Sequence, residues 1–148
     1  MAAQNSQYLE SKVLTAPTYR LHLMLIEGAI RFGRQAAEAL QRGDQVAAAT
    51  SMLRVVDIVG EMLAAVRGTA SNLNKRLTEL YWFLFRLASE AKIHSDVEKL
   101  AALLRLLEYE RQTWQMLCDK LGGDSKSGLS HAANLAPSLP KSGFSIEA

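Results

Sequence analysis

The sequence predicts an all-α fold: an antiparallel up-down-up-down four-helix bundle with a short N-terminal segment and a disordered C-terminal tail. Only three prolines occur, and two lie near the C-terminus, so proline interrupts no helix between residues 17 and 122. Alanine, leucine, glutamate and arginine, all good helix formers, dominate that stretch, and the alternating runs typical of strands are missing. The expected connections are only about one to three residues long, which forces consecutive helices to lie antiparallel.

Glycine and capping residues bound the first two predicted helices. The first is expected over about 17–42, with Thr15 as its N-cap and Gly43 as its stop. The second is expected over about 44–67 and ends before Gly68. In the first helix, apolar residues recur every three or four positions, which places them on one wide helical face: Leu21, Leu25, Ala29, Phe32, Ala36 and Leu40, with Leu23, Ile26 and Ile30 beside them.

The third and fourth predicted helices follow the same pattern. The third is expected over about 71–93, with leucines and alanines on one face. The fourth begins with a capping box, in which Ser95 caps one backbone amide and Glu98 reaches back to another. Its apolar stripe has one misfit, Arg111, and the pair Gly122–Gly123 is expected to end the helix.

The chain divides into a bundle domain over 1–121 and a tail over 122–148. Glycine, serine and proline are abundant in the tail, so we expect it to be flexible and largely disordered. The tail also carries large apolar residues, so a short docking motif stays open as a second interpretation: Leu129, Leu135, Leu139, Phe144 and Ile146.

Composition and charge exclude several classes of protein. At 148 residues, 49% of them apolar, the chain is long enough for one domain with a substantial core. The formal net charge is +2, and basic residues are scattered among acidic ones, so we expect no nucleic-acid partner. The sequence lacks the apolar run of roughly 18 residues that spans a membrane, and its polar start does not resemble a signal peptide. The cytosol is therefore the expected location.

No catalytic or metal-binding pattern emerges, so the sequence predicts a protein without enzymatic activity, cofactor or metal. Di-metal bundles use Glu-x-x-His on two helices, whereas Glu90 and His94 are four positions apart and occur once. His22, His94 and His131 fall on a helix face, a helix end and the tail, and are not expected to converge. The single cysteine, Cys118, excludes an intrachain disulfide and lies on an apolar seam, where we expect a buried small hydrophobe.

Aromatic residues crowd one part of the third predicted helix: Tyr81, Trp82, Phe83 and Phe85. They point around more than half of the helix circumference, so some of them face away from the core seam. Two interpretations stay open. The group forms an exposed patch that binds a protein partner, or a broad core or the N-terminal segment covers it.

Several short stretches carry a family resemblance. Tyr8 precedes Val-Leu-Thr-Ala at 13–16, and residues 23–29 read Leu-Met-Leu-Ile-Glu-Gly-Ala. Further along come Arg-Gly-Asp at 42–44, Asp-Ile-Val at 57–59, Leu-Tyr at 80–81 and Glu-Ala-Lys-Ile-His-Ser-Asp-Val-Glu at 90–98. In this order and at these separations, they resemble the flagellar secretion chaperone (FliS) family over about residues 8–118. Arg111 and Trp114 match the family's Arg-x-x-Trp, whereas Ile26 and Glu27 replace its Tyr-Asp pair.

The resemblance implies a cytosolic export chaperone that binds the disordered C-terminal segment of flagellin, prevents its premature polymerisation and assists flagellar secretion. Grooves between helices would hold that segment as short amphipathic helices, without ATP or metal. Contact with the flagellar export apparatus, and a monomeric or weakly dimeric state, are compatible with this role. The alternative is another helical-bundle secretion adaptor or scaffold protein with a different client.

The residues expected to contact the partner come from three parts of the chain. In the N-terminal segment they are Tyr8, Val13 and Leu14, which the resemblance places over the bundle near the path of the client. The rest belong to the first and third predicted helices: Leu23, Ile26, Ile30, Tyr81, Trp82 and Phe85.

Overall fold

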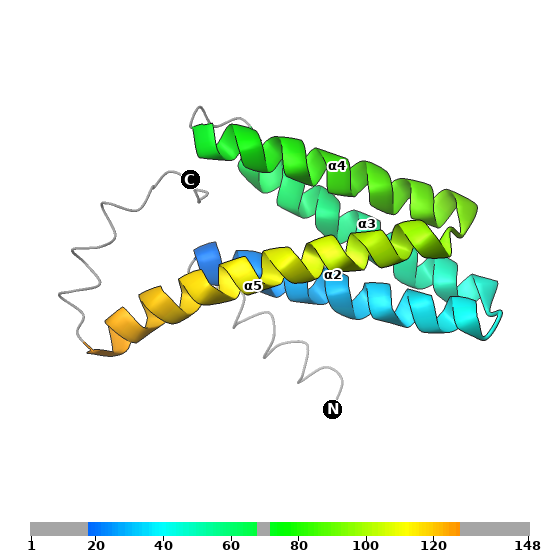
Figure 1. Ribbon diagram of the computed structural model, residues 1–148, viewed down its shortest axis with the longest axis horizontal. Coiled ribbons are helices and arrows are strands. Elements are labelled where there is room, and N and C mark those ends of the chain that lie inside the picture. Colours follow the sequence, from blue (N-terminus) through cyan, green and yellow to red (C-terminus); the bar gives the residue numbers. More distant parts are fainter. Residues whose placement is uncertain (1–17, 68–71, 128–148) are drawn as a thin grey trace, which may run out of the picture.

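The computed structural model describes residues 18–67 and 72–127, which form four helices. These are α2 (Thr18–Gln41), α3 (Gln45–Val66), α4 (Asn72–His94) and α5 (Val97–Ser127). Both α2 and α4 pack against α3 and α5, so the helices surround one core, and helices adjacent in the chain run antiparallel (Figure 1). The predicted all-α four-helix bundle is confirmed. No helix in the described ranges combines the length and the hydropathy that a membrane crossing requires.

Two predicted parts of the chain lie outside the described residues. One is the N-terminal segment with Tyr8, Val13, Leu14 and the cap Thr15, and the other is the tail beyond residue 127. Predictions about these parts stay predictions.

Predicted and observed helix boundaries agree closely except at the end of α5. The prediction that Gly122–Gly123 ends this helix is wrong, because α5 continues to Ser127. A glycine inside a helix costs only about 1 kcal/mol relative to alanine, whereas a glycine stop requires a backbone with positive φ. Among the described glycines only Gly43 has positive φ. At Gly122 the helix still lies against the side chain of Arg20 in α2.

The turn between α2 and α3 is closed by one glycine and one aspartate. Gly43 has a φ of 75°, and the Asp44 N–H donates to the carbonyl of Ala39 at 2.9 Å, as in a Schellman motif. The Asp44 side chain accepts a hydrogen bond from the Ala47 N–H at 3.1 Å and so caps α3. The predicted stop at Gly43 is therefore confirmed, and the same short stretch begins the next helix.

The turn between α4 and α5 corrects the predicted capping box. Ser95 has a φ of 50° and ends α4, while the Asp96 N–H donates to the carbonyl of Ala91 at 3.0 Å. Asp96 is the N-cap, because its Oδ1 accepts from the backbone N–H groups of Glu98 and Lys99, each at 3.0 Å. The Ser95 hydroxyl bonds instead to Gln45 Oε1 at 3.1 Å and thereby joins the two turns at this end of the bundle.

The core draws on all four helices. Its largest fully buried apolar side chains are Ile26 of α2, Val55, Val59, Met62 and Val66 of α3, Tyr81 and Leu84 of α4, and Leu100, Leu103 and Leu107 of α5. Cys118 is also fully buried, which confirms that it packs as a small hydrophobe. Burial raises the pKa of its thiol, so a reactive thiolate is disfavoured.

Replacing Ser95 by glycine should stabilise the fold by about 0.5–1 kcal/mol. At a φ of 50° a residue with a Cβ atom is strained by about 1 kcal/mol, whereas glycine adopts this conformation freely. Urea denaturation measures the change in the free energy of unfolding. Ser95→Ala is the matched control, because it removes the exposed hydroxyl but keeps the Cβ atom. Equal stability of the glycine and alanine variants would contradict this account of the turn.

Candidate functional site

Among the described residues, two grooves of different chemistry flank α5. The groove against α2 has a volume of about 600 Å³ and is lined mainly by charged side chains: Glu27, Ile30, Arg31, Arg34, Gln35, Glu38, Glu108 and Arg111. The groove against α4 has a volume of about 410 Å³ and is mainly apolar: Leu77, Glu110, Thr113, Trp114, Met116, Leu117 and Lys120. The chemistry of these lining residues shows which groove is the better candidate for a binding site.

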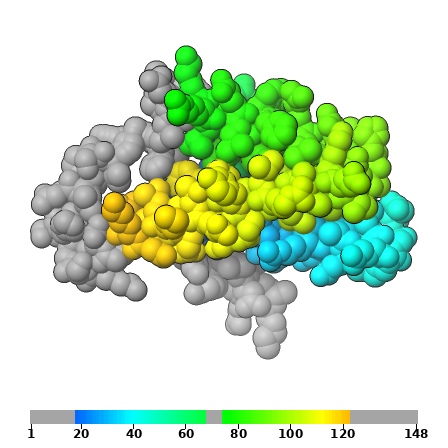
Figure 2. All heavy atoms as spheres, viewed as in Figure 1, coloured from blue at the N-terminus to red at the C-terminus, as the bar shows by residue number. Residues whose placement is uncertain are grey.

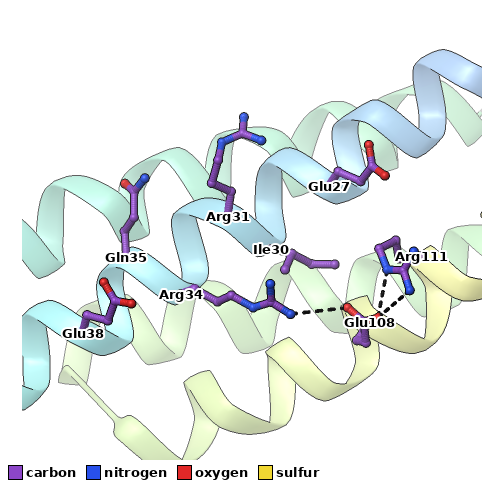
Figure 3. Close-up of a pocket in the computed structure, with 8 residues that line it drawn as sticks. All are labelled: Glu27, Ile30, Arg31, Arg34, Gln35, Glu38, Glu108 and Arg111. Carbon is purple, nitrogen blue, oxygen red and sulfur yellow. Dashed lines mark hydrogen bonds and ion pairs between the residues drawn. The ribbon is translucent and has the colours of Figure 1, made fainter.

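The larger groove is an ionic surface. Arg34 of α2 and Arg111 of α5 both reach Glu108, at 3.7 and 2.7 Å (Figure 3). The Arg111 guanidinium lowers the pKa of the Glu108 carboxyl and keeps it charged. Three arginines and three glutamates cancel in formal charge, and solvent-exposed pairs of this kind contribute little free energy. Arg111, the misfit of the predicted apolar stripe, thus belongs to a solvated face beside the core.

The smaller groove is a better binding surface. It lies along the half of the bundle where α4 and α5, which meet at their shared turn, diverge from each other (Figure 1). The two helices lie side by side on the face shown in Figure 2. Met116 in its wall is 70% exposed, so a large apolar side chain is left in water. An open apolar surface between two helices suits the apolar face of an amphipathic helix.

A buried polar network lies at the base of the apolar groove and joins three helices. His22 Nε2 of α2 lies 2.6 Å from the Tyr81 hydroxyl of α4, and that hydroxyl lies 3.3 Å from Glu110 Oε1 of α5. When His22 donates from Nε2, Tyr81 accepts this bond and donates its one proton to Glu110, which satisfies both distances. The His22 ring also packs on Trp114, with ring centroids 4.1 Å apart.

Burial sets the protonation of this network. It lowers the pKa of His22 to about 4, so the imidazole is neutral at pH 7. Burial also raises the pKa of Tyr81 and of Glu110, and for Glu110 the hydrogen bond from Tyr81 acts in the opposite direction. The described residues contain no group of three or more His, Cys, Asp or Glu side chains that could hold a metal ion.

The structure places four of the predicted partner-binding residues in the core. Leu23, Ile26, Ile30 and Tyr81 are each at most 4% exposed. The apolar stripe of α2 is wide because this helix packs against both α3 and α5, so its second row of residues is covered as well. In this conformation these side chains stabilise the bundle, and a partner would contact them only if the core opened.

The other aromatic residues of α4 remain accessible to different degrees. Trp82 is 50% and Phe83 49% exposed, whereas Phe85 is half-buried and packs beside Gly60 of α3. Trp82 and Phe85 stack with ring centroids 5.8 Å apart and an interplanar angle of 9°. Trp82 also lines a small hollow of about 250 Å³ between α3 and α4, together with Leu63, Arg67 and Thr78. The aromatic group is therefore split between the core and an exposed surface.

Sequence reasoning missed the α5 wall of the apolar groove. One signal was present, since Met116 lies two positions after Trp114 and therefore on the outer side of the buried seam that continues to Cys118. Periodicity shows that such a residue faces outward, but it does not show that a neighbouring helix diverges beside it. The groove depends on that divergence.

Comparisons with known proteins all identify the same family. A family model described as "Flagellar protein FliS" matches residues 1–121. The chain is 26% identical over 117 residues to a flagellar secretion chaperone FliS of Bacillus subtilis, covering 78% of this chain and 87% of that protein. It is 25% identical over 114 residues to the protein of the same name in Salmonella typhimurium, covering 76% of this chain and 84% of that protein.

Replacing His22 by glutamine should flatten the pH dependence of stability in acid. The folded protein holds the pKa of His22 at about 4, below the ordinary 6.5, so between these values the unfolded chain binds more protons. The histidine therefore contributes stability at pH 7, and roughly 3 kcal/mol of it is lost as the pH falls to about 4. Urea denaturation at a series of pH values measures this slope.

Glu110 shifts stability in the opposite sense. Its raised pKa favours the protonated carboxyl in the folded state, so its contribution to the free energy of unfolding grows as the pH falls. Glu110 is present in both proteins, so the difference in the free energy of unfolding between wild type and His22→Gln gives the contribution of the histidine. Parallel pH curves for the two proteins would contradict the buried, neutral imidazole.

Proposed function

Because the chain belongs to the FliS family of flagellar proteins, whose relatives are flagellar secretion chaperones, we propose that it is a cytosolic, non-enzymatic export chaperone for flagellin. It binds the disordered C-terminal segment of flagellin and so prevents polymerisation before secretion. The family supports the chaperone role in flagellar export. We assign the client-binding site to the apolar groove between α4 and α5, because its apolar lining is open to solvent.

The dimensions of the groove limit how much of a client it holds. Its α5 wall runs from Glu110 to Lys120, and ten residues of helix rise about 15 Å, or about three turns. A client segment of about 40 residues therefore needs further contacts. Trp82 and Phe85 offer one on the side of α4 that packs against α3, and Tyr8, Val13 and Leu14 offer another from the N-terminal segment.

Binding of this kind needs no ATP or metal. A disordered client loses conformational entropy when it folds on the chaperone, and that loss offsets part of the free energy gained from apolar burial. The affinity per unit of buried area is correspondingly low. A complex held by shallow apolar contacts can then give up its client at the export apparatus, which we propose as the second partner.

Replacing Met116 by glutamate should weaken client binding about tenfold or more. Burying a methionine side chain contributes about 1.5–3 kcal/mol, and a charge in the groove opposes the docking of an apolar face. The probe is the C-terminal segment of the flagellin from the same genome, about 40 residues long. Calorimetry measures its dissociation constant, and circular dichroism measures the helix that it gains on binding.

Ile93→Glu is the matched control. Ile93 is also 70% exposed on a helix, but it lies near the turn between α4 and α5, away from the groove. The control should leave the dissociation constant unchanged. If the wild-type protein gives neither heat nor added helicity with this segment, the proposed client is wrong and a different secretion client must be sought. If the two variants weaken binding equally, the assigned site is wrong.

A further inference from the structure

The apolar groove contains one buried carboxylate. Of the described residues that line it, only Glu110 is acidic, and this residue is 9% exposed; Leu77, Trp114 and Leu117 line the same groove. Acidic side chains are rarely buried to this degree unless they are paired. The presence of this one in a surface suited to apolar contacts therefore calls for a physical reason.

Hydrogen bonds within the bundle use only part of the acceptor capacity of Glu110. Its Oε1 accepts a hydrogen bond from the Tyr81 hydroxyl, which lies 3.3 Å away. An ionised carboxylate can accept about four hydrogen bonds in all. The bond from Tyr81 leaves room for a donor that arrives through the groove.

No countercharge neutralises this carboxylate within the described part of the chain. The ion pairs formed there involve other acids: Asp44, Glu90 and Glu108. Lys120 lines the same groove, but it lies ten residues further along α5, which is about 15 Å along the helix axis. Burial raises the pKa of this carboxyl and so disfavours its charged form, and a cation brought by a ligand would stabilise that form.

We propose that Glu110 is a specificity-determining residue of the groove, which selects a client helix that carries one lysine or arginine within its apolar face. This inference rests on the proposed function, since it names the chemistry of the client at the same site. The methylene stem of such a residue packs along Leu77, Trp114 and Leu117, while its charged head reaches the carboxylate. An apolar helix without this residue covers Glu110 but supplies no countercharge, so that helix binds more weakly.

Two synthetic peptides test the proposal. Each is an amphipathic helix of about 18 residues, or five turns, with a leucine face; one has lysine at the centre of that face and the other has glutamine. Fluorescence anisotropy gives the dissociation constants for the wild-type protein and for Glu110→Gln. This substitution preserves side-chain size and an acceptor for Tyr81. We expect the wild-type protein to prefer the lysine peptide about tenfold, and Glu110→Gln to lose that preference.

Glu98→Gln is the matched control, because it changes the net charge by the same amount at an exposed position in the first turn of α5. It should keep the preference for lysine. The proposal is overturned if Glu110→Gln retains the preference, if Glu98→Gln loses it equally, or if the wild-type protein binds the two peptides equally or not at all. Binding of the flagellin segment is measured in parallel. If the flagellin segment binds but the wild-type protein does not prefer the lysine peptide, this inference alone is wrong. If the flagellin segment does not bind, the proposed client is wrong.

Discussion

Two tight turns at one end of the bundle, each closed by a residue with positive φ, hold the helices together there. Gly43 ends α2 and Ser95 ends α4, and each is followed by an aspartate whose side chain caps the next helix. The bond between Ser95 and Gln45 links the two turns directly. Helices fixed at one end can diverge at the other without losing their alignment, and the apolar groove lies where α4 and α5 diverge (Figure 1).

The buried polar network links that groove to the core. Burying the His22–Tyr81–Glu110 network has a desolvation cost that a fully apolar contact would not have, and the lowered pKa of His22 reflects this cost. The network fixes α2, α4 and α5 in one relative position, because its hydrogen bonds tolerate little sliding of one helix past another. The same residues therefore stabilise the diverging end of the bundle and place a carboxylate at the base of its groove.

The sequence predicts the number, type and order of the helices well, because apolar periodicity, Gly43 and Asp44 all favour the same boundaries. It fails where two local signals compete. The serine and aspartate before α5 are both good caps, and only the backbone geometry shows that Asp96 caps the helix while Ser95 ends the previous one. It fails again at Gly122, where the cost of a glycine within a helix is modest and α5 continues to Ser127.

The candidate site is less predictable than the fold for a physical reason. The family resemblance and the surplus apolar positions of the first and third predicted helices make Ile26 and Tyr81 expected partner contacts, yet both are completely buried. Which apolar residues stay uncovered depends on how far two helices separate, and that distance is set by side chains on all four of them. The divergence leaves Met116 exposed and keeps Glu110 within reach of the groove. A partly open bundle therefore combines a closed core with an apolar surface that stays open to solvent.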